Sequence, residues 1–473
     1  MYNPNSNQPE AFINHNEIMD TLDWAERNKH NLALVDIVLA KAASRGGLTH
    51  REASLLLACD DPARQKEMYR LAAQVKRDFY GNRIVMFAPL YLSNYCVNGC
   101  VYCPYHAQNK HIARKKLSQA EIAREVMALQ DMGHKRLALE TGEDPVHSPI
   151  EYVLESIDTI YGIKHNNGAI RRVNVNIAAT TVENYRKLHD AGIGTYVLFQ
   201  ETYHKQSYER LHPTGPKRDY AWHTEAMDRA MEGGIDDVGI GVLFGLERYK
   251  YELAGLIMHA EHLEAAFGVG PHSISVPRIK RADDVDPNSF DHGIDDDIFL
   301  KIIAVIRLAV PYSGMIISTR EHKDVRAKAL RLGISQISGG SRTSVGGYAE
   351  PESETDKSEQ FNVSDKRSLD EVVHWLMDLG YIPSFCTACY REGRTGDRFM
   401  QLLKAGQIHN CCHPNALMTL QEYLCDYAAP DTLRIGKKLI ASEVPSIPKA
   451  HVRTMCARNL ASIAEGGARD LFL

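Results

Sequence analysis

The stretch Asn94-Tyr-Cys-Val-Asn-Gly-Cys-Val-Tyr-Cys-Pro-Tyr105 holds three cysteines, Cys96, Cys100 and Cys103, in the spacing C-x3-C-x2-C. Three thiols this close cannot all pair as disulfides. They can bind three corners of one iron–sulfur cubane, because cysteine thiolate is the usual ligand of such clusters. The fourth iron would then lack a protein ligand, and an open coordination site is where a cluster can do chemistry.

The alternative for this first triad is a zinc knuckle. Zinc requires four ligands, and only His106 or His111 could supply a fourth one locally. The spacing and the interleaved aromatic residues, among them Tyr102, resemble the radical S-adenosylmethionine (SAM) superfamily. That resemblance implies that the open iron binds the amino and carboxylate groups of SAM, and that one electron from the cluster cleaves SAM to methionine and a 5′-deoxyadenosyl radical.

Composition and charge argue against several classes of protein. The 473 residues have a net charge of −5, with 44% hydrophobic and 24% charged residues, which is typical of a globular protein and does not favour nucleic-acid binding. Residues 1–16 are polar and lack the apolar segment of a secretory signal, and no apolar run of about 18 residues predicts a membrane-spanning helix. Ten cysteines without a signal indicate metal binding in a reducing compartment, so we expect a cytoplasmic protein that contacts no membrane.

The middle of the chain alternates between apolar strand-like runs and amphipathic helical stretches. Near-continuous apolar strands separated by helices predict a parallel sheet, here a complete (β/α)8 TIM barrel. We expect an N-terminal helical extension at 1–82, the barrel at 83–343, a loop or linker at 344–366 and a mostly helical C-terminal cluster domain at 367–473. The expected strands are Arg83–Leu90, Arg136–Glu140, Arg172–Ala178, Thr195–Glu201, Asp237–Phe244, His272–Pro277, Met315–Thr319 and Gln336–Ser338.

A second cysteine cluster lies in the last quarter of the chain. Cys386 and Cys389 form a C-x2-C pair, and Cys412 follows after 22 residues. Three thiols again suit a cubane with one open iron, and Cys411 could replace Cys412. A structural zinc site completed by a histidine at 409 or 413 is the alternative.

The two triads, with an intact barrel between them, resemble the HydG family, the radical SAM tyrosine lyases that mature [FeFe]-hydrogenases. The related thiazole-pathway ThiH lyases lack the C-terminal cluster domain. The resemblance implies cleavage of L-tyrosine at Cα–Cβ to p-cresol and dehydroglycine. Dehydroglycine would then give CO and cyanide on an iron at the second cluster, and an Fe(CO)2(CN)–cysteine synthon would leave.

The implied cofactors are SAM and two [4Fe-4S] clusters. The C-terminal cluster would become a [5Fe-5S] form with a fifth iron and bound cysteine or homocysteine. The implied partners are L-tyrosine, L-cysteine, Fe2+, a low-potential electron donor and other hydrogenase maturation proteins.

The same resemblance assigns roles to individual residues. His272 would bind the fifth iron, and Arg320, Ser341 and Arg342 would hold the tyrosine carboxylate or assist. A forked guanidinium suits a carboxylate, so Arg218 would pair with SAM. The remaining SAM contacts would be Tyr102, Glu140, Thr141, Gly142, Asn176, Gln200 and Glu201.

Two rival functions stay open at this point. One is a thiazole-pathway tyrosine lyase that carries an extra structural metal domain. The other is a non-enzymatic iron–sulfur scaffold, although a scaffold seldom needs a full barrel with a SAM site.

Overall fold

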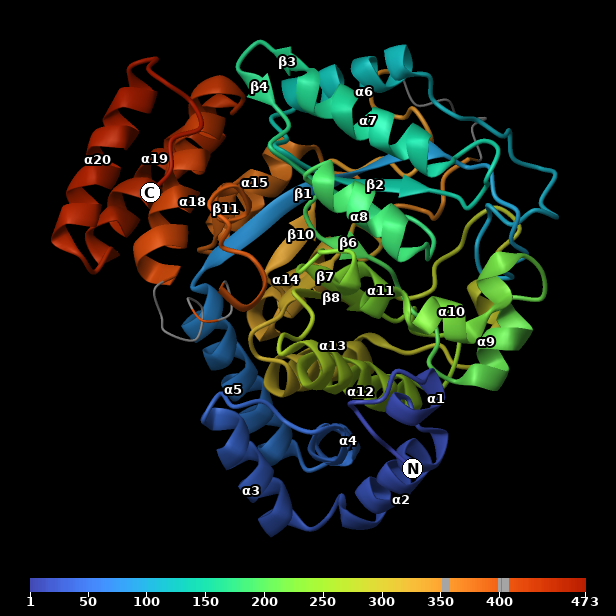
Figure 1. Ribbon diagram of the computed structural model, residues 1–473. Helices are drawn as coiled ribbons and strands as arrows, with labels where there is room; N and C mark the ends of the chain where they lie inside the picture. Colours follow the sequence, from blue (N-terminus) through green and yellow to red (C-terminus); the bar gives the residue numbers. More distant parts are fainter. Residues whose placement is uncertain (351–357, 399–400, 402–407) are drawn as a thin grey trace.

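The structure is a computed structural model that describes residues 1–350, 358–398, 401 and 408–473. Eight parallel strands form a closed barrel, because β10 pairs with β1 as well as with β9 (Figure 1). Helices surround the strands and cover the outer face of the barrel. The predicted (β/α)8 barrel is therefore confirmed.

The strands are shorter at some positions and longer at others than the apolar runs indicate. β1 continues three residues past Leu90, whereas β6 has only two residues in the ladder. The barrel strands are β1 Arg83–Ser93, β2 Arg136–Thr141, β5 Arg172–Asn176, β6 Tyr196–Val197, β7 Val238–Gly241, β8 Ser273–Ser275, β9 Gly314–Ile317 and β10 Gln336–Ser338, and a hairpin is formed by β3 Lys164–His165 and β4 Gly168–Ala169.

Helices precede the barrel and alternate with its strands. Capping boxes at Thr49 and Ser118 begin two of them. Each hydroxyl accepts a hydrogen bond from the backbone amide three residues later, and the glutamate at that position accepts one from the backbone amide of the capping residue. The N-terminal helices are α1 Pro9–Phe12, α2 His15–Asn28, α3 Leu32–Ala43, α4 His50–Ala58 and α5 Pro62–Tyr80. Those around the barrel are α6 Gln119–Asp131, α7 Ile150–Gly162, α8 Val182–Asp190, α9 Lys205–Leu211, η1 Pro216–Arg218, α10 Tyr220–Thr224, α11 Ala226–Glu232, α12 Tyr249–Phe267, η2 Pro287–Ser289, α13 Asp296–Ala309 and α14 Lys323–Leu332.

The C-terminal part adds a ninth strand that the sequence pattern does not predict. β11, Ile382–Ser384, pairs in parallel with the start of β1. Its central Pro383 argues against a strand, but proline is tolerated at a sheet edge. The strand carries the following Cys386 beneath the barrel. The other C-terminal elements are α15 Leu369–Asp378, α16 Ala388–Arg391, α18 Ile408–Asp426, α19 Pro430–Glu443, η3 Val444–Ser446 and α20 Ala450–Ala464.

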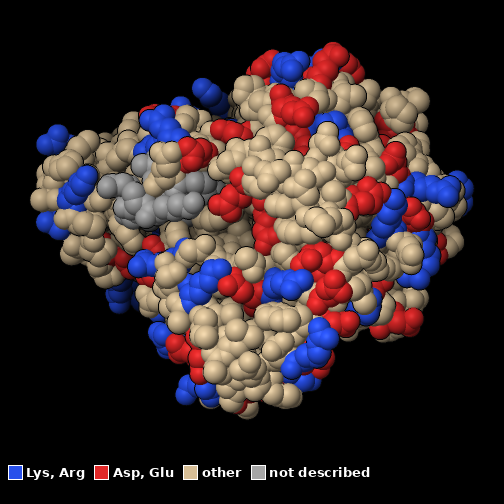
Figure 2. Space-filling model, turned by 60° about the horizontal axis from the view of Figure 1, so that its bottom comes forward, with Lys and Arg blue, Asp and Glu red and all other residues tan. Residues whose placement is uncertain are grey.

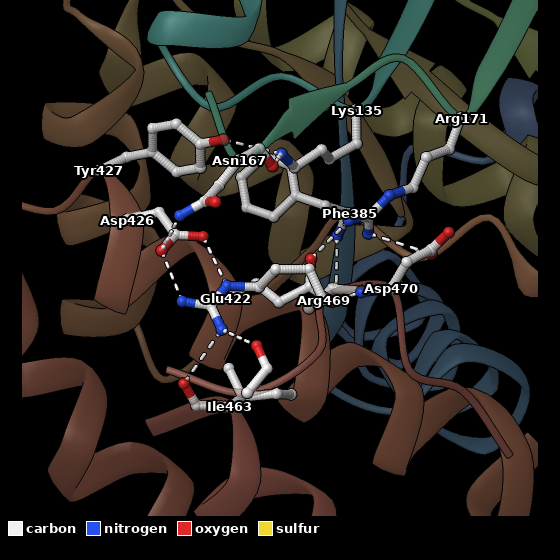
Figure 3. Close-up of polar contacts among 12 residues, drawn as sticks. Lys135, Asn167, Arg171, Phe385, Glu422, Asp426, Tyr427, Ile463, Arg469 and Asp470 are labelled. Atoms are coloured by element: carbon white, nitrogen blue, oxygen red, sulfur yellow. Dashed lines mark hydrogen bonds and ion pairs between the residues drawn. The ribbon is translucent and has the colours of Figure 1, made fainter. Parts of the chain in front are cut away.

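Charged contacts hold these C-terminal helices against the barrel (Figure 3). Arg171, just before β5, lies 2.7 Å from Glu422 of α18 and 3.2 Å from Asp470. Arg469 binds Asp426 at 2.7 Å. The Arg171 and Glu422 side chains are 6% and 2% exposed, so removal of either would leave a buried charge. The C-terminal helices are therefore fixed to the amino-terminal end of the barrel.

The charges on the surface and the lengths of the apolar helices agree with what the composition predicts. On the face shown in Figure 2, basic and acidic side chains are interspersed. Among the described residues, no helix combines the length and the apolar character that crossing a bilayer requires.

A buried ion pair joins the barrel to the segment before α15, and its loss is expected to destabilise the fold. Arg326 of α14 donates to Asp365, and these side chains are 0% and 2% exposed. Arg367 also donates to Asp365, at 2.7 Å. We expect Asp365→Asn to lower the free energy of unfolding by about 3–5 kcal/mol, because two guanidiniums lose their carboxylate.

Denaturant unfolding measures this effect, and Asp431→Asn is the control. Asp431 is 81% exposed beside Arg434 and should change stability by less than about 0.5 kcal/mol. Burial alone would raise the pKa of Asp365, but Arg367 and Arg326 outweigh it and lower the pKa from 3.8 to about 2. The stabilisation that the Asp365 carboxylate contributes to the fold is thus complete above pH 3.8 and disappears as the pH falls toward 2. Equal stability of the Asp365 and Asp431 variants near neutral pH would contradict this account.

Candidate functional site

The first cysteine triad lies in the loop after β1, at the carboxyl-terminal end of the barrel. The Gly99 amide donates to the Thr214 carbonyl at 3.0 Å, and the Val101 amide donates to that of Leu211 at 3.1 Å. All three triad thiols, at positions 96, 100 and 103, line one cavity, called here the upper cavity. Tyr102 also lines it, and its hydroxyl lies 2.6 Å from Nε2 of His212.

The end of β2 packs directly against this loop. A Cβ on Gly142 would lie 2.2 Å from the Tyr95 carbonyl oxygen, so only glycine allows this approach. Thr141 Oγ1 contacts the Gly142 carbonyl at 2.5 Å. Glu140 and Asn176 are register partners on β2 and β5, and both line the upper cavity. Burial raises the pKa of Glu140 to about 8, although a hydrogen bond from Asn176 opposes the shift.

A partly buried ion pair occupies one wall of the upper cavity. Lys217 Nζ lies 2.8 Å from Glu201 Oε1, and these side chains are 16% and 12% exposed. Glu201 has a φ of 65°, a strained backbone conformation of a kind that concentrates at functional sites. The sequence points to Glu201 but not to Lys217, whose only signal is its position next to Arg218.

Two predicted SAM contacts lie outside the upper cavity. Gln200 donates to Thr224 at 2.9 Å and does not line the cavity. Arg218 is exposed and lines a shallow surface hollow with Trp222. The structure therefore brings Lys217, rather than Arg218, to the position where a cation could meet an anionic ligand.

A middle cavity lies inside the barrel below the upper one. Arg320 lines both cavities, and its guanidinium stacks on the Phe361 ring at 3.6 Å. Ser341 and Arg342 line neither of them. The Ser341 hydroxyl is buried, and the Arg342 amide is bound to the Tyr348 hydroxyl at 3.0 Å.

The second triad lines a lower cavity at the opposite, amino-terminal end of the barrel. Cys386, Cys389 and Cys412 all line it, together with His272. His272 directly precedes β8, and its Nε2 lies 3.4 Å from the Tyr390 hydroxyl. Burial lowers the pKa of His272, which keeps the imidazole neutral as a metal ligand requires. This location explains why the histidine stands at a strand start.

The thiols of the second triad interact with one another. Cys411 is 3.7 Å from Cys412 but does not line the lower cavity. Hydrogen bonds from Cys389 and Cys411 lower the pKa of Cys412. The geometry thus presents Cys412 to the cavity and leaves Cys411 behind it.

The histidines of the zinc alternatives have other partners. Nε2 of His106 lies 3.0 Å from Asp284, and Nδ1 of His111 lies 3.5 Å from Asp283. His413 is 3.2 Å from the Ser446 hydroxyl, and neither His413 nor His409 lines the lower cavity.

Both triads have the donor set that a cubane needs. Within the described ranges, no three His, Cys, Asp or Glu side chains gather in a way that would hold a single metal ion. Cubane ligands each bind a different iron and so need not converge on one point. Burial raises the pKa of the Cys100 thiol to about 12, so cluster binding would release its proton.

The three cavities form a series along the barrel. The upper and middle cavities share Glu140, Asn176 and Arg320, and Gln336 lines both the middle and the lower cavity. Their free volumes are about 150, 110 and 80 Å³ from top to bottom. Each exceeds the roughly 15 Å³ that one water needs, so each could hold a small molecule.

Comparisons with known proteins agree with this geometry. Residues 90–253 match the radical SAM superfamily, and residues 275–382 match the biotin and thiamin synthesis associated domain. The 2-iminoacetate synthase of Salmonella typhimurium is 31% identical over 66% of this chain and 80% of its own length. That of Escherichia coli is 29% identical over 76% of this chain and 93% of its own length.

Solved structures match nearly the whole chain. A HydG structure, described as a maturase of the [FeFe]-hydrogenase, is 53% identical, with a TM-score of 0.94 over 98% of this chain and all of that one. HydG from Carboxydothermus hydrogenoformans is 38% identical, with a TM-score of 0.84 over 96% of this chain and 100% of that one. The chain is therefore a radical SAM lyase that belongs to the HydG family.

Proposed function

We propose that this enzyme cleaves L-tyrosine at Cα–Cβ to p-cresol and dehydroglycine, and then forms CO and cyanide at its second cluster. The product would be an Fe(CO)2(CN)–cysteine synthon for [FeFe]-hydrogenase maturation. The observation that carries this proposal is the position of two cysteine triads at opposite ends of one barrel, with cavities in series between them.

The upper end would bind SAM and a [4Fe-4S] cluster held by Cys96, Cys100 and Cys103. Bound together, cluster and SAM supply a 5′-deoxyadenosyl radical. The chain's own contribution is to position its ligands and exclude water. Glu201 and Lys217 offer opposite charges for the polar groups of SAM, and the end of β2 contributes Gly142 and its neighbours.

Arg320 is the residue best placed to hold the tyrosine carboxylate. Its guanidinium lies where the upper and middle cavities meet, so a bound tyrosine could extend its ring downward while its amino group stays near SAM. A forked guanidinium also fixes a carboxylate in one orientation. Glu140 lines the same junction, and its raised pKa lets it carry a proton near neutral pH.

The lower end would hold the second [4Fe-4S] cluster through Cys386, Cys389 and Cys412. His272 would bind the fifth iron of a [5Fe-5S] form, with cysteine or homocysteine as a further ligand. Fe2+, L-cysteine and other hydrogenase maturation proteins would be the partners of this end, whereas a low-potential electron donor would reduce the first cluster.

Product analysis of the anaerobically reconstituted protein tests the proposal. Incubation with SAM, a reductant and L-tyrosine should yield 5′-deoxyadenosine and p-cresol, followed by CO that a haemoprotein traps. A chain that makes p-cresol but no CO would instead fit a thiazole-pathway lyase, and iron and zinc counts would then show one cubane and one zinc. A chain that makes no 5′-deoxyadenosine would fit a scaffold.

A further inference from the structure

Three arginines line the lower cavity, and none of them is paired with an aspartate or glutamate side chain in the described part of the chain. Arg83 is the first residue of β1, Arg136 is the first residue of β2, and Arg394 follows α16. Within the described part of the chain, none of the three forms a salt bridge; Asp237 is the acidic side chain that lines this cavity beside them. A buried guanidinium is normally paired, so three in one small cavity require an explanation.

The hydrogen bonds of these arginines leave nitrogens unused. Nη2 of Arg136 donates to the Cys386 carbonyl at 3.1 Å, and Nη2 of Arg394 donates to a Leu473 main-chain oxygen at 3.3 Å. Arg83 Nη2, Arg136 Nε and Arg394 Nε are buried and have no hydrogen-bond partner. Arg83 and Arg136 are only 8% and 6% exposed.

Two other fully buried arginines of this chain have partners for their charge or for most of their donors. Arg307 donates to the carbonyls of Gly333, Pro311 and Ser313, at 2.7–3.3 Å. Arg326 is paired with Asp365. Unused donors also occur elsewhere, because the Nε atoms of Arg326, Arg171 and Arg172 are buried without a partner. Among the described residues, the lower cavity therefore differs in gathering three arginines that have no aspartate or glutamate partner.

The negative groups of the cavity offset this charge only in part. Asp237 lies 3.3 Å from His272 and accepts from the Gly396 amide at 3.1 Å. Thiolates at the three cysteines would add negative charge, but the core of a cubane is itself cationic and cancels part of it. An anion bound next to the cluster would complete the balance.

From these contacts we infer that Arg83 and Arg136, supported by Arg394, bind the carboxylate of a small amino or imino acid beside the second cluster. Guanidinium donors match a carboxylate in geometry and charge. The free volume of about 80 Å³, which the ligand would share with the cluster, favours a small ligand. This inference rests on the proposed function, which delivers a two-carbon imino acid, dehydroglycine, to this cavity; the carboxylate of free cysteine has the same chemistry.

Calorimetric binding to the fully reconstituted protein tests the inference with stable probes. Glyoxylate presents the two-carbon carboxylate, glycolaldehyde lacks the charge, and L-cysteine represents the second source. We expect glyoxylate or L-cysteine to bind and glycolaldehyde to fail. Arg136→Gln and Arg83→Gln should each raise the dissociation constant of the probe that binds by about tenfold or more. Arg136→Lys should recover part of the loss, and Arg434→Gln, an exposed arginine on α19, should change nothing.

Parallel measurements separate the possible failures. Iron per chain and p-cresol should stay normal in the Arg83 and Arg136 variants, while CO formation falls. If the variants lose the iron of the second triad, the arginines only neutralise thiolates and the inference is wrong. Unchanged probe binding would also overturn it. Absence of p-cresol and CO from the unaltered enzyme would instead refute the proposed function.

Discussion

A variant that carries Cys386→Ala and Cys389→Ala is expected to release p-cresol at a nearly normal rate while its CO formation falls by more than about 100-fold. Even changes around a metal's ligands cost about 10- to 100-fold, and this variant removes two of three ligands. The first triad lies at the opposite end of the barrel and keeps all its contacts, so SAM cleavage should continue. The measurement is p-cresol by chromatography beside CO trapped by a haemoprotein, with iron counted per chain.

Two single variants serve as matched controls. Cys425→Ala removes an exposed thiol and should leave both products unchanged. Cys411→Ala should also retain CO, because Cys412 rather than Cys411 lines the lower cavity. Normal CO from the double variant would show that the second triad has another role. Loss of CO in the Cys411 variant alone would assign the third ligand to Cys411.

Lys217→Met should lower the rate of 5′-deoxyadenosine formation by on the order of 100-fold. Lys217 is paired with Glu201 inside the upper cavity, and both side chains are largely shielded from water, so removal of the lysine leaves a carboxylate without its counter-charge. Glu201 would then stand unpaired where SAM should bind. The rate is measured against SAM concentration, which separates weaker binding from slower cleavage.

Arg218→Met is the informative comparison for Lys217. The resemblance to the HydG family assigns the SAM carboxylate to Arg218, whereas the structure places this side chain on the surface. We expect the Arg218 variant to retain most of its activity. A larger loss in the Arg218 variant than in the Lys217 variant would restore the original assignment.

Much of the fold follows from local patterns in the chain. The C-x3-C-x2-C stretch and the alternation of apolar strands with helices predict a barrel with a cluster loop after its first strand, and the structure has both. The capping box at Thr49 is also visible in the sequence. These features depend on residues close to one another in the chain.

Other features depend on contacts that no local pattern records. The run Thr195–Glu201 suggests a whole strand, but only Tyr196 and Val197 join the ladder. Glu201 then adopts a positive φ, which breaks the alternation of side chains in a strand. The sequence pattern therefore does not predict whether Gln200 or Glu201 faces the cavity. Arg83 and Arg136 look like ordinary residues at strand starts until β11 brings the second triad beneath them.

The length of β1 determines how far apart the two cysteine triads are held. This strand runs from Arg83 at the lower cavity to Ser93, just before the first triad's loop, with one register shift between Tyr91 and Ser93. At about 3.3 Å per residue, it acts as a stiff spacer of roughly 35 Å. The two cysteine triads therefore cannot approach each other by hinge bending or by a swinging arm. Under the proposed function, the compound that passes from one to the other must diffuse as a free small molecule.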